Sequence, residues 1–351
     1  MRFFIVLVFL IFPFFLTDLI LIQTFNALNI FWFIFSTFMF IYIYINKDKE
    51  YESGFKDKYY KDIPSDKNPE LLGYLLTGEA KERFFIASVF ELIRKNVIKI
   101  AKSNKDYILV YNLKHRESLS KGEYYIIKWL FHLLGNDYEV PLSKIKEESK
   151  KNSGFFSFCF HEWANIIEVD AAQQNIFENK GSIFMDILVY FLISYVLAIY
   201  NAILTNNYIL AILIGIGTSI FIIYTNSFKK RTKESNLEYE KWEAFKRYLK
   251  SSECTLNDMD SKEFLKIFVY SKVLKIEKNF KSIMKRSRER DDDQLFVAIN
   301  LGIIDELDRA ISRGIKYSEM ATNIFFSKNK GVTQILRKRY NDNITFIYNK
   351  D

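Results

Sequence analysis

Few residues in this chain have the types and the spacing that metal binding requires. His161 and Glu162 begin like the helix of a zinc protease, but that chemistry needs a second histidine one turn later, where Asn165 stands. Cys159 lies two residues before His161, a spacing that contributes to a metal site only if further ligands join it. The remaining candidates are scattered along the chain: His115, His132 and Cys254. We therefore expect packed cysteines and hydrogen-bonded histidines, and no metal site.

The sequence also lacks the patterns of nucleotide binding and hydrolysis. It has no glycine-rich loop ending in Lys-Ser or Lys-Thr, no Gly-x-Gly-x-x-Gly after an expected strand, and no nucleophile elbow of a serine hydrolase. Neighbouring acids such as Glu147 and Glu148 lie in charge-rich runs that are typical of solvated surfaces. We expect no cofactor and no enzymatic activity.

The composition indicates a folded chain. Of the 351 residues, 49% are hydrophobic and 17% are aromatic, which excludes a disordered or low-complexity protein. Lys and Arg total 50 against 42 Asp and Glu, for a formal net charge of +8. The two cysteines lie far apart, which excludes a disulfide framework.

Four apolar segments have the length of transmembrane helices. Between Phe3 and Asn46, Asp18 is the only charged residue, and two segments of about 20 residues fit there. A second pair flanks the uncharged turn from Asn201 to Asn207. The fold class predicted is a mainly α integral membrane protein with two transmembrane hairpins, whose expected spans are 3–22, 28–45, 183–200 and 208–224.

The distribution of Lys and Arg predicts the orientation of these spans. Both hairpin turns lack Lys and Arg, whereas positive residues flank the opposite ends of the spans, at 47–49 and 229–231. Both termini and the region between the hairpins are therefore expected in the cytoplasm. The first span lacks a small-x-small cleavage site, so we expect it to remain uncleaved. Asp18 and Asp186 lie near span ends, and we interpret them as interfacial rather than as a proton relay.

The region between the hairpins has the pattern of a winged-helix-like α+β module. Periodic apolar residues predict two helices, and alternating residues around a short turn predict a β-hairpin after them. Ser120 and Glu123 then open another helix as a capping box. The expected elements are helices 70–77 and 80–95, strands 97–102 and 106–111, a helix at 120–134, an extended piece at 139–142 and a polar helix at 143–151.

Two further segments complete the predicted organisation of the chain. The aromatic residues from Phe155 to Trp163 are open to two interpretations, packing in a core or position at the membrane interface. Residues 293–315 predict two short helices around Gly302, as a local helical hairpin rather than a repeat array. The expected domains are a transmembrane hairpin at 1–46, a solvated linker at 47–68, the winged-helix-like module at 69–118, a small helical module at 119–180, a second hairpin at 181–228, amphipathic helices at 229–280 and a basic helical tail at 281–351.

Four stretches occur in an order that resembles a known family. They are NPELLGYLLTGEAKERFFIASVFELIRKNVIKI, SLSKGEYYIIKWLF, YEKWEAFKRYLK and EFLKIFVYSKVLKI, with two spans between the second and the third. Their order is similar to that of the uncharacterised bacterial YciQ-like predicted membrane proteins, which contain a domain of unknown function. The resemblance implies a winged-helix-like unit on the cytoplasmic face of the bacterial cytoplasmic membrane, and no established activity. Two features differ: the β-rich extracytoplasmic region expected before the first span is missing, and a charged tail replaces a glycine-rich one.

The positive charge is concentrated after the last span. Residues 229–351 carry 27 Lys and Arg against 19 acids, whereas residues 47–182 carry 22 against 21. The candidate contacts with anionic lipids are Lys229, Lys230, Arg231 and Lys233. The candidate wing contacts are Lys99, Lys102 and Lys105. A nearly neutral module whose central helix is apolar almost all round disfavours nucleic-acid binding.

The leading hypothesis is a multi-pass membrane protein of unknown biochemical activity that presents its winged-helix-like module for protein interaction or scaffolding. The alternative is a membrane-tethered nucleic-acid-binding regulator. The expected partners are membrane lipids and a cytoplasmic protein or a second copy of the chain.

Overall fold

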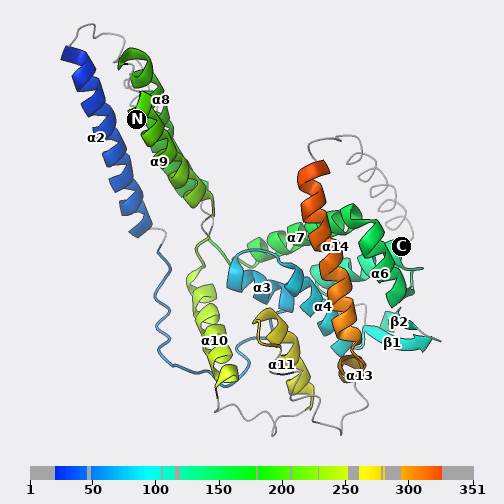
Figure 1. Cartoon of the computed structure of the whole chain (residues 1–351). Helices are drawn as coiled ribbons and strands as arrows, with labels where there is room; N and C mark the ends of the chain where they lie inside the picture. The colour runs from blue at the N-terminus through cyan, green and yellow to red at the C-terminus, as the bar shows by residue number, and fades with distance from the viewer. Residues whose placement is uncertain are drawn as a thin grey trace. The chain divides into compact units, whose positions relative to one another are not determined.

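The computed structural model describes residues 20–45, 49–103, 106–114, 119–178, 181–205, 208–227, 229–251, 261–277, 280 and 294–325. In these ranges the protein is mainly helical, with one three-stranded sheet. It divides into two compact units (Figure 1): unit 1 is Met1–Gly54 with Asn175–Leu237, and unit 2 is Phe55–Gln174 with Glu238–Asp351. Nearly all of the expected span 3–22, including Asp18, and the tail after residue 325 lie outside the described residues.

Unit 1 is built from three apolar helices. They are α2 (Ile20–Ile43), α8 (Gly181–Thr205) and α9 (Tyr208–Ser227). Helix α8 packs against both α2 and α9, and the three run side by side (Figure 1). Phe221 lies between Phe40 and Phe191, with ring centroids 4.9 and 5.0 Å away. A Cβ atom on Gly217 of α9 would lie 2.7 Å from the Phe33 ring, so the glycine permits the close approach of α2.

One helix within the described ranges is long and apolar enough to cross a membrane, over residues Asn26–Ile43. The apolar parts of α8 and α9, Leu188–Leu204 and Tyr208–Ile223, are shorter. The second predicted hairpin is therefore present as two apolar helices. Of the four expected spans, the second, at 28–45, corresponds to the helix that is long and apolar enough to cross a membrane. Asp186 lies in α8.

Unit 2 combines segments from before and after α8 and α9. Before them come α3 (Pro69–Thr77), α4 (Glu82–Arg94), β1 (Ile98–Ser103), β2 (Asp106–Tyr111), α5 (Lys121–Ile127), the π-helix η4 (Lys128–Leu134), β3 (Glu139–Pro141), α6 (Leu142–Lys151) and α7 (Ser153–Gln173). After them come most of α10 (Lys233–Lys250), then α11 (Ser261–Val273), α13 (Gln294–Asn300) and α14 (Ile303–Phe325).

Local signals in the sequence account for the ends of several elements. Pro69 lies in the first turn of α3, and Gly78 ends that helix with a left-handed φ of +72°. The predicted capping box is confirmed, because Ser120 and Glu123 exchange hydrogen bonds at the start of α5. The hairpin β1–β2 is antiparallel, and the expected extended piece forms β3, which pairs with β2.

Helix α4 lies at the centre of unit 2. All ten residues from Phe84 to Ile93 are buried. The helix contacts α3 and α5 from the earlier segment, and α11, α13 and α14 from the later one. Phe90 stacks on Phe268 of α11 with ring centroids 6.3 Å apart. The core therefore requires both segments, because neither covers α4 alone.

The aromatic residues of α7 belong to this core. Phe85 of α4 contacts Trp129 and Trp163, with centroid distances of 4.6 and 5.2 Å. Phe156, Phe160 and Trp163 are all buried. For these residues the core interpretation holds and the interfacial one does not.

One prediction of length needs correction. Gly302 separates α13 from α14 as expected, but α14 is longer than predicted and continues to Phe325. Gly314 lets the Phe156 ring pack closely against this helix. The segment at 55–68 belongs to the predicted solvated linker; it is extended, and none of its residues is buried. It runs along α10 and α11. Ser65 donates to Glu238 at 2.5 Å, and the Tyr270 hydroxyl donates to the Lys67 carbonyl at 3.0 Å.

The contact between α3 and α4 provides a stability test. A Cβ atom on Gly73 would lie 2.2 Å from the base of the Phe84 ring, whereas one on Gly154 would meet nothing within 4 Å. We expect Gly73→Ala to lower the free energy of unfolding by about 1–3 kcal/mol, because the buried ring has no space to move. Gly154→Ala is the matched control and should be neutral or stabilise by up to about 1 kcal/mol. Thermal unfolding of the full chain in detergent measures both. Equal effects of the two variants would contradict this packing.

Candidate functional site

Three short segments of unit 1 meet in a charged cluster beside the apolar helices. Arg231 forms an ion pair with Glu50, with Nη1 and Oε1 3.1 Å apart, and its backbone N–H also donates to that carboxylate. Lys230 is only 4% exposed, and its Nζ lies 3.9 Å from the centroid of the Tyr51 ring. The Tyr51 hydroxyl donates to Glu178 at 2.5 Å. The cluster thus joins residues 50–51, 176–178 and 230–232 within this unit.

This cluster contains two of the four residues proposed to contact lipid. Lys230 is buried and Arg231 is half-buried, whereas Lys229 and Lys233 are exposed. Spacing alone could not distinguish them, because all four belong to one basic run. Lipid contact at these positions stays a prediction.

The proposed wing residues lie on the outer strand of the sheet. Lys99 and Lys102 are exposed on β1, and Lys105 lies outside the described residues. The backbone N–H of Ile100 donates to Gln294 of α13 at 3.1 Å, so α13 covers part of this strand. The expected recognition helix is α4, which is buried on all sides and presents no polar face to a base edge.

Within the described ranges, the sequence candidates for metal binding do not come together. Cys159 is buried in α7, and burial raises the pKa of its thiol to about 12. His161 bonds the Ser157 carbonyl one turn earlier, and His132 contacts Asp137 at 2.8 Å. His115 and Cys254 lie outside the described ranges. Among the residues that are described, no group of three or more His, Cys, Asp or Glu could hold a metal ion.

A buried carboxylate network joins α3, α4 and α5. Glu70 is 1% exposed and accepts hydrogen bonds from Ser88 at 2.5 Å and Ser120 at 2.7 Å. Glu123 is fully buried and pairs with Lys95 at 2.7 Å. Burial and the neighbouring charge of Glu123 raise the pKa of Glu70 to about 7. Sequence reasoning missed this network, because its members are local cap and helix residues that meet only after folding.

A carboxyl group that titrates near neutrality is a feature of many catalytic sites, but ion-pair networks produce it too. The side chains that contact Glu70 come from the helices it joins, and a Cβ atom on Gly122 would lie 3.2 Å from its Oε1. This close packing supports a structural role for Glu70 as a buried connection between helices.

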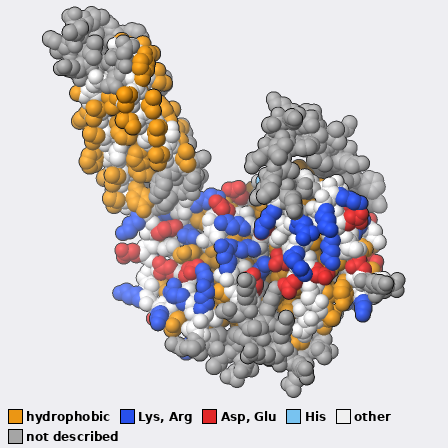
Figure 2. Space-filling model, in the orientation of Figure 1, with side chains coloured by type: hydrophobic (Ala, Val, Ile, Leu, Met, Phe, Trp, Pro, Cys, Tyr) orange, Lys and Arg blue, Asp and Glu red, His pale blue; other side chains and the backbone are white. Residues whose placement is uncertain are grey.

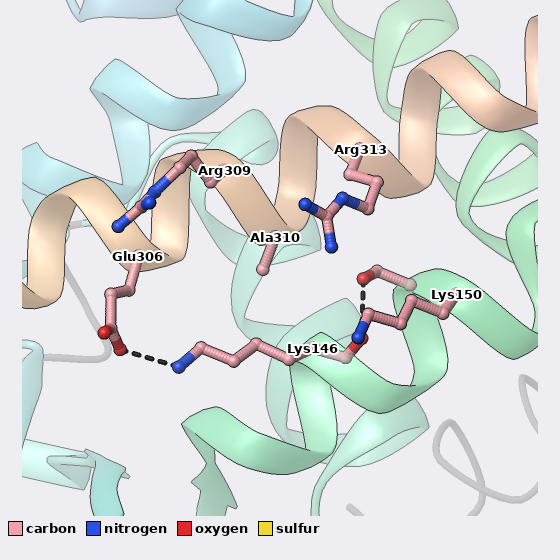
Figure 3. Close-up of a pocket in the computed structure, with 7 residues that line it drawn as sticks. Lys146, Lys150, Glu306, Arg309, Ala310 and Arg313 are labelled. Atoms are coloured by element: carbon pink, nitrogen blue, oxygen red, sulfur yellow. Dashed lines mark hydrogen bonds and ion pairs between the residues drawn. The ribbon is translucent and has the colours of Figure 1, made fainter.

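A second feature missed from the sequence is a basic cleft between α6 and α14 (Figure 3). It has a volume of about 190 Å³, and its lining includes Lys146, Lys150, Glu306, Arg309, Ala310 and Arg313. Lys146 reaches across to Glu306, with Nζ and Oε2 2.7 Å apart. The sequence holds a signal for it in the spacing of four between Lys146 and Lys150 and between Arg309 and Arg313. The two pairs are about 160 residues apart, so their meeting could not be predicted.

Comparison with known proteins identifies a family for most of the chain. Residues 56–284 match the family model described as "Predicted membrane protein (DUF2207) C-terminal domain". No curated protein and no solved structure matches. The match confirms the expected relationship to a membrane protein family with a domain of unknown function, and the narrower YciQ-like assignment stays a prediction.

The titration of Glu70 gives the second test. Because its pKa is higher in the folded than in the unfolded chain, its contribution to stability is complete below about pH 4.5 and is lost as the pH rises through about 7. Glu70→Gln should remove this dependence, which amounts to roughly 3 kcal/mol. Unfolding in denaturant across this range measures the slope.

The matched control is Glu243→Gln, which alters a partly exposed carboxylate paired with Lys246 on α10. This variant should keep the slope of the unaltered chain. A Glu70→Gln variant with that same slope would show that Glu70 does not titrate as described.

Proposed function

The chain belongs to the DUF2207 C-terminal domain family of predicted membrane proteins, and from this premise we propose that it is a multi-pass protein of the bacterial cytoplasmic membrane. Unit 2 is proposed to act there as a cytoplasmic protein-interaction or scaffolding module. The observation that carries the membrane part is the inverted polarity of unit 1, whose helices expose large apolar side chains and bury several polar ones between them.

The face of the unit 1 helices seen in Figure 2 is largely apolar. Within the described residues, 20 of the 26 exposed large apolar side chains lie in residues 30–45 or in α8 and α9. Ile209 is 75% exposed, Ile203 68% and Phe38 66%. Exposure of this surface to water would be unfavourable, whereas contact with the apolar tails of lipids would not.

Several polar side chains of α2 and α8 lie between the helices of unit 1. Asn29 is 2% exposed and donates to the Leu197 carbonyl at 3.3 Å, and Ser36 contacts Ser194 at 3.3 Å. Hydrogen bonds of this kind connect helices in lipid, where burial of apolar surface provides no driving force for their association. Together with the predicted span at 3–22, α2, α8 and α9 would make the four expected spans.

The assembly of unit 2 from two segments of the chain supports its position on one side of the bilayer. Its two segments flank α8 and α9 in the sequence and share one core around α4. A pair of membrane helices between them returns the chain to the side that it left. The positive residues next to the spans favour the cytoplasmic side.

A scaffolding role is favoured by the covered state of α4 and by the lack of a catalytic arrangement among the described residues. The order of two helices, a hairpin and a third strand is compatible with a winged-helix-like module. Burial of α4 disfavours the alternative, a membrane-tethered nucleic-acid binder, because the helix that would read bases is in the core.

One end of the sheet is the best candidate for the interaction surface. The exposed large apolar side chains in the described part of unit 2 are Leu113, Tyr124, Tyr138, Val169 and Leu301. Since Val110 of β2 pairs with Glu139 of β3, Leu113 and Tyr138 lie at the same end of the sheet. Exposed tyrosine is enriched in protein interfaces.

The proposal predicts a discrete protein contact at this sheet end. A photoreactive phenylalanine analogue introduced at Tyr138 in the full chain should form an adduct of defined mass with one protein in native membranes. The same analogue at Val169, 56% exposed on α7, is the control and should not form that adduct. The full chain is necessary, because a fragment such as 60–180 would uncover α4.

Adducts only with lipid at position 138, or the same adducts at both positions, would contradict a protein contact at the sheet end. A nucleic-acid adduct at Tyr138 would favour the alternative function.

A further inference from the structure

The basic cleft in unit 2 has a charge arrangement that helix stability does not explain. Lys146 and Lys150 are four residues apart on α6, and Arg309 and Arg313 are four residues apart on α14. Like charges at this spacing on one helix repel each other and destabilise it. Here two such pairs face each other across one cleft, so the repulsion of each pair is increased by the other.

The negative charge in the cleft is too small to balance them. Glu306 is the acid that lines it, and this carboxylate is already paired with Lys146. Among the described residues, no carboxylate forms an ion pair with Lys150 or Arg313. Arg309 donates to the Asp305 backbone carbonyl, at 3.1 Å, rather than to a carboxylate. The cleft therefore carries an excess of about three positive charges.

The helix dipole accounts for part of this set only. Lys150 lies in the last turn of α6, where a cation is favoured by the helix dipole. Arg309 and Arg313 lie in the interior of α14, more than one turn from either end, where that effect has decayed. The helix dipole therefore does not account for the two arginines.

The shape of the cleft supports a small anion as that explanation. Ala310 lies between the two ends (Figure 3), with Arg313 and Lys150 toward one end and Arg309 and Glu306 toward the other. Its methyl group leaves the space between the cations open. The volume of about 190 Å³ is below the roughly 300–1,000 Å³ of sites for larger organic ligands. The cleft cannot enclose a whole nucleotide, whereas it can enclose a phosphate group.

We propose that the cleft between α6 and α14 binds a phosphate monoester, with Lys150 and Arg313 as its principal ligands and Arg309 and the Lys146–Glu306 pair beside them. Arginine and lysine are the side chains that phosphate oxygens prefer. The phosphate could be part of a lipid headgroup or of a soluble compound, which have the same chemistry at the site. The proposal goes beyond the proposed function, and it can fail or hold independently because it does not involve membrane topology.

Thermal unfolding of the full chain in an uncharged detergent tests this site. Inorganic phosphate, titrated at constant ionic strength against chloride, should raise the unfolding midpoint through ligand binding to the folded state. The double variant Lys150→Gln/Arg313→Gln should weaken the apparent affinity at least about tenfold, because each side chain supplies a charged hydrogen bond. Ala310→Leu fills the cleft and should weaken binding without a change in charge. Lys144→Gln is the control, since Lys144 is exposed on the same helix and does not line the cleft.

The source of the phosphate is distinguished by two further ligands. A soluble short-chain phosphatidic acid that binds much more tightly than glycerol 3-phosphate supports a lipid headgroup, and equal binding supports a soluble phosphate ester. Short-chain phosphatidylcholine should not bind through these residues. No midpoint shift beyond that of chloride, or equal affinities in the double variant and the control, would overturn the proposal. Tighter binding of an oligonucleotide through the same residues would overturn it too.

Discussion

The covering of α4 is the interaction on which the rest of this structure depends. Its ten central residues are buried, and three of them are phenylalanines. Burial of each such side chain contributes about 1.5–3 kcal/mol, so an uncovered α4 would leave unit 2 without most of its stability. Helix α4 is covered by α3 and α5, which precede the apolar hairpin α8–α9 in the sequence, and by α11, α13 and α14, which follow it. A segment of about 60 residues, Asn175–Leu237, is therefore inserted into the sequence of unit 2 without dividing its core.

This arrangement limits how the chain can meet a membrane. Two segments that share one core must lie on one side of a bilayer, so α8 and α9 act as a pair if they enter it. The inverted polarity of unit 1 agrees with that role, as Asn29, Ser36 and Ser194 turn inward and the large aliphatic side chains turn outward. Because both segments are needed to cover α4, unit 2 is a closed module, and α4 is not exposed to contact the bases of a nucleic acid. Its surface, including the sheet end and the basic cleft, is what remains available for partners.

Much of the fold could be predicted from local signals, and little of the candidate sites could. Gly78 and the pair Ser120 and Glu123 fix helix ends through neighbours in the sequence, and the β1–β2 hairpin follows from alternation around a short turn. Because the side chains of α4 are apolar almost all round, the sequence predicted that other elements would cover it. No local pattern indicates that Phe268 would cover Phe90. Lys229 and Lys230 are neighbours in one basic run, and the sequence does not indicate that Lys230 is buried against the Tyr51 ring while Lys229 is exposed. The cleft was missed because Lys150 and Arg313 belong to different segments.

The central claim, that both flanks of the hairpin lie together on one side of the membrane, is tested most directly by labelling with a membrane-impermeant maleimide. Single cysteines at Lys99, before the hairpin, at Lys250, after it, and at Tyr208, at the start of α9, would be placed in a chain with Cys254→Ser; Cys159 is buried. The account predicts that Lys99→Cys and Lys250→Cys react only after cells are opened, whereas Tyr208→Cys reacts in intact cells. Reaction of Lys99→Cys and Lys250→Cys from opposite sides would contradict it.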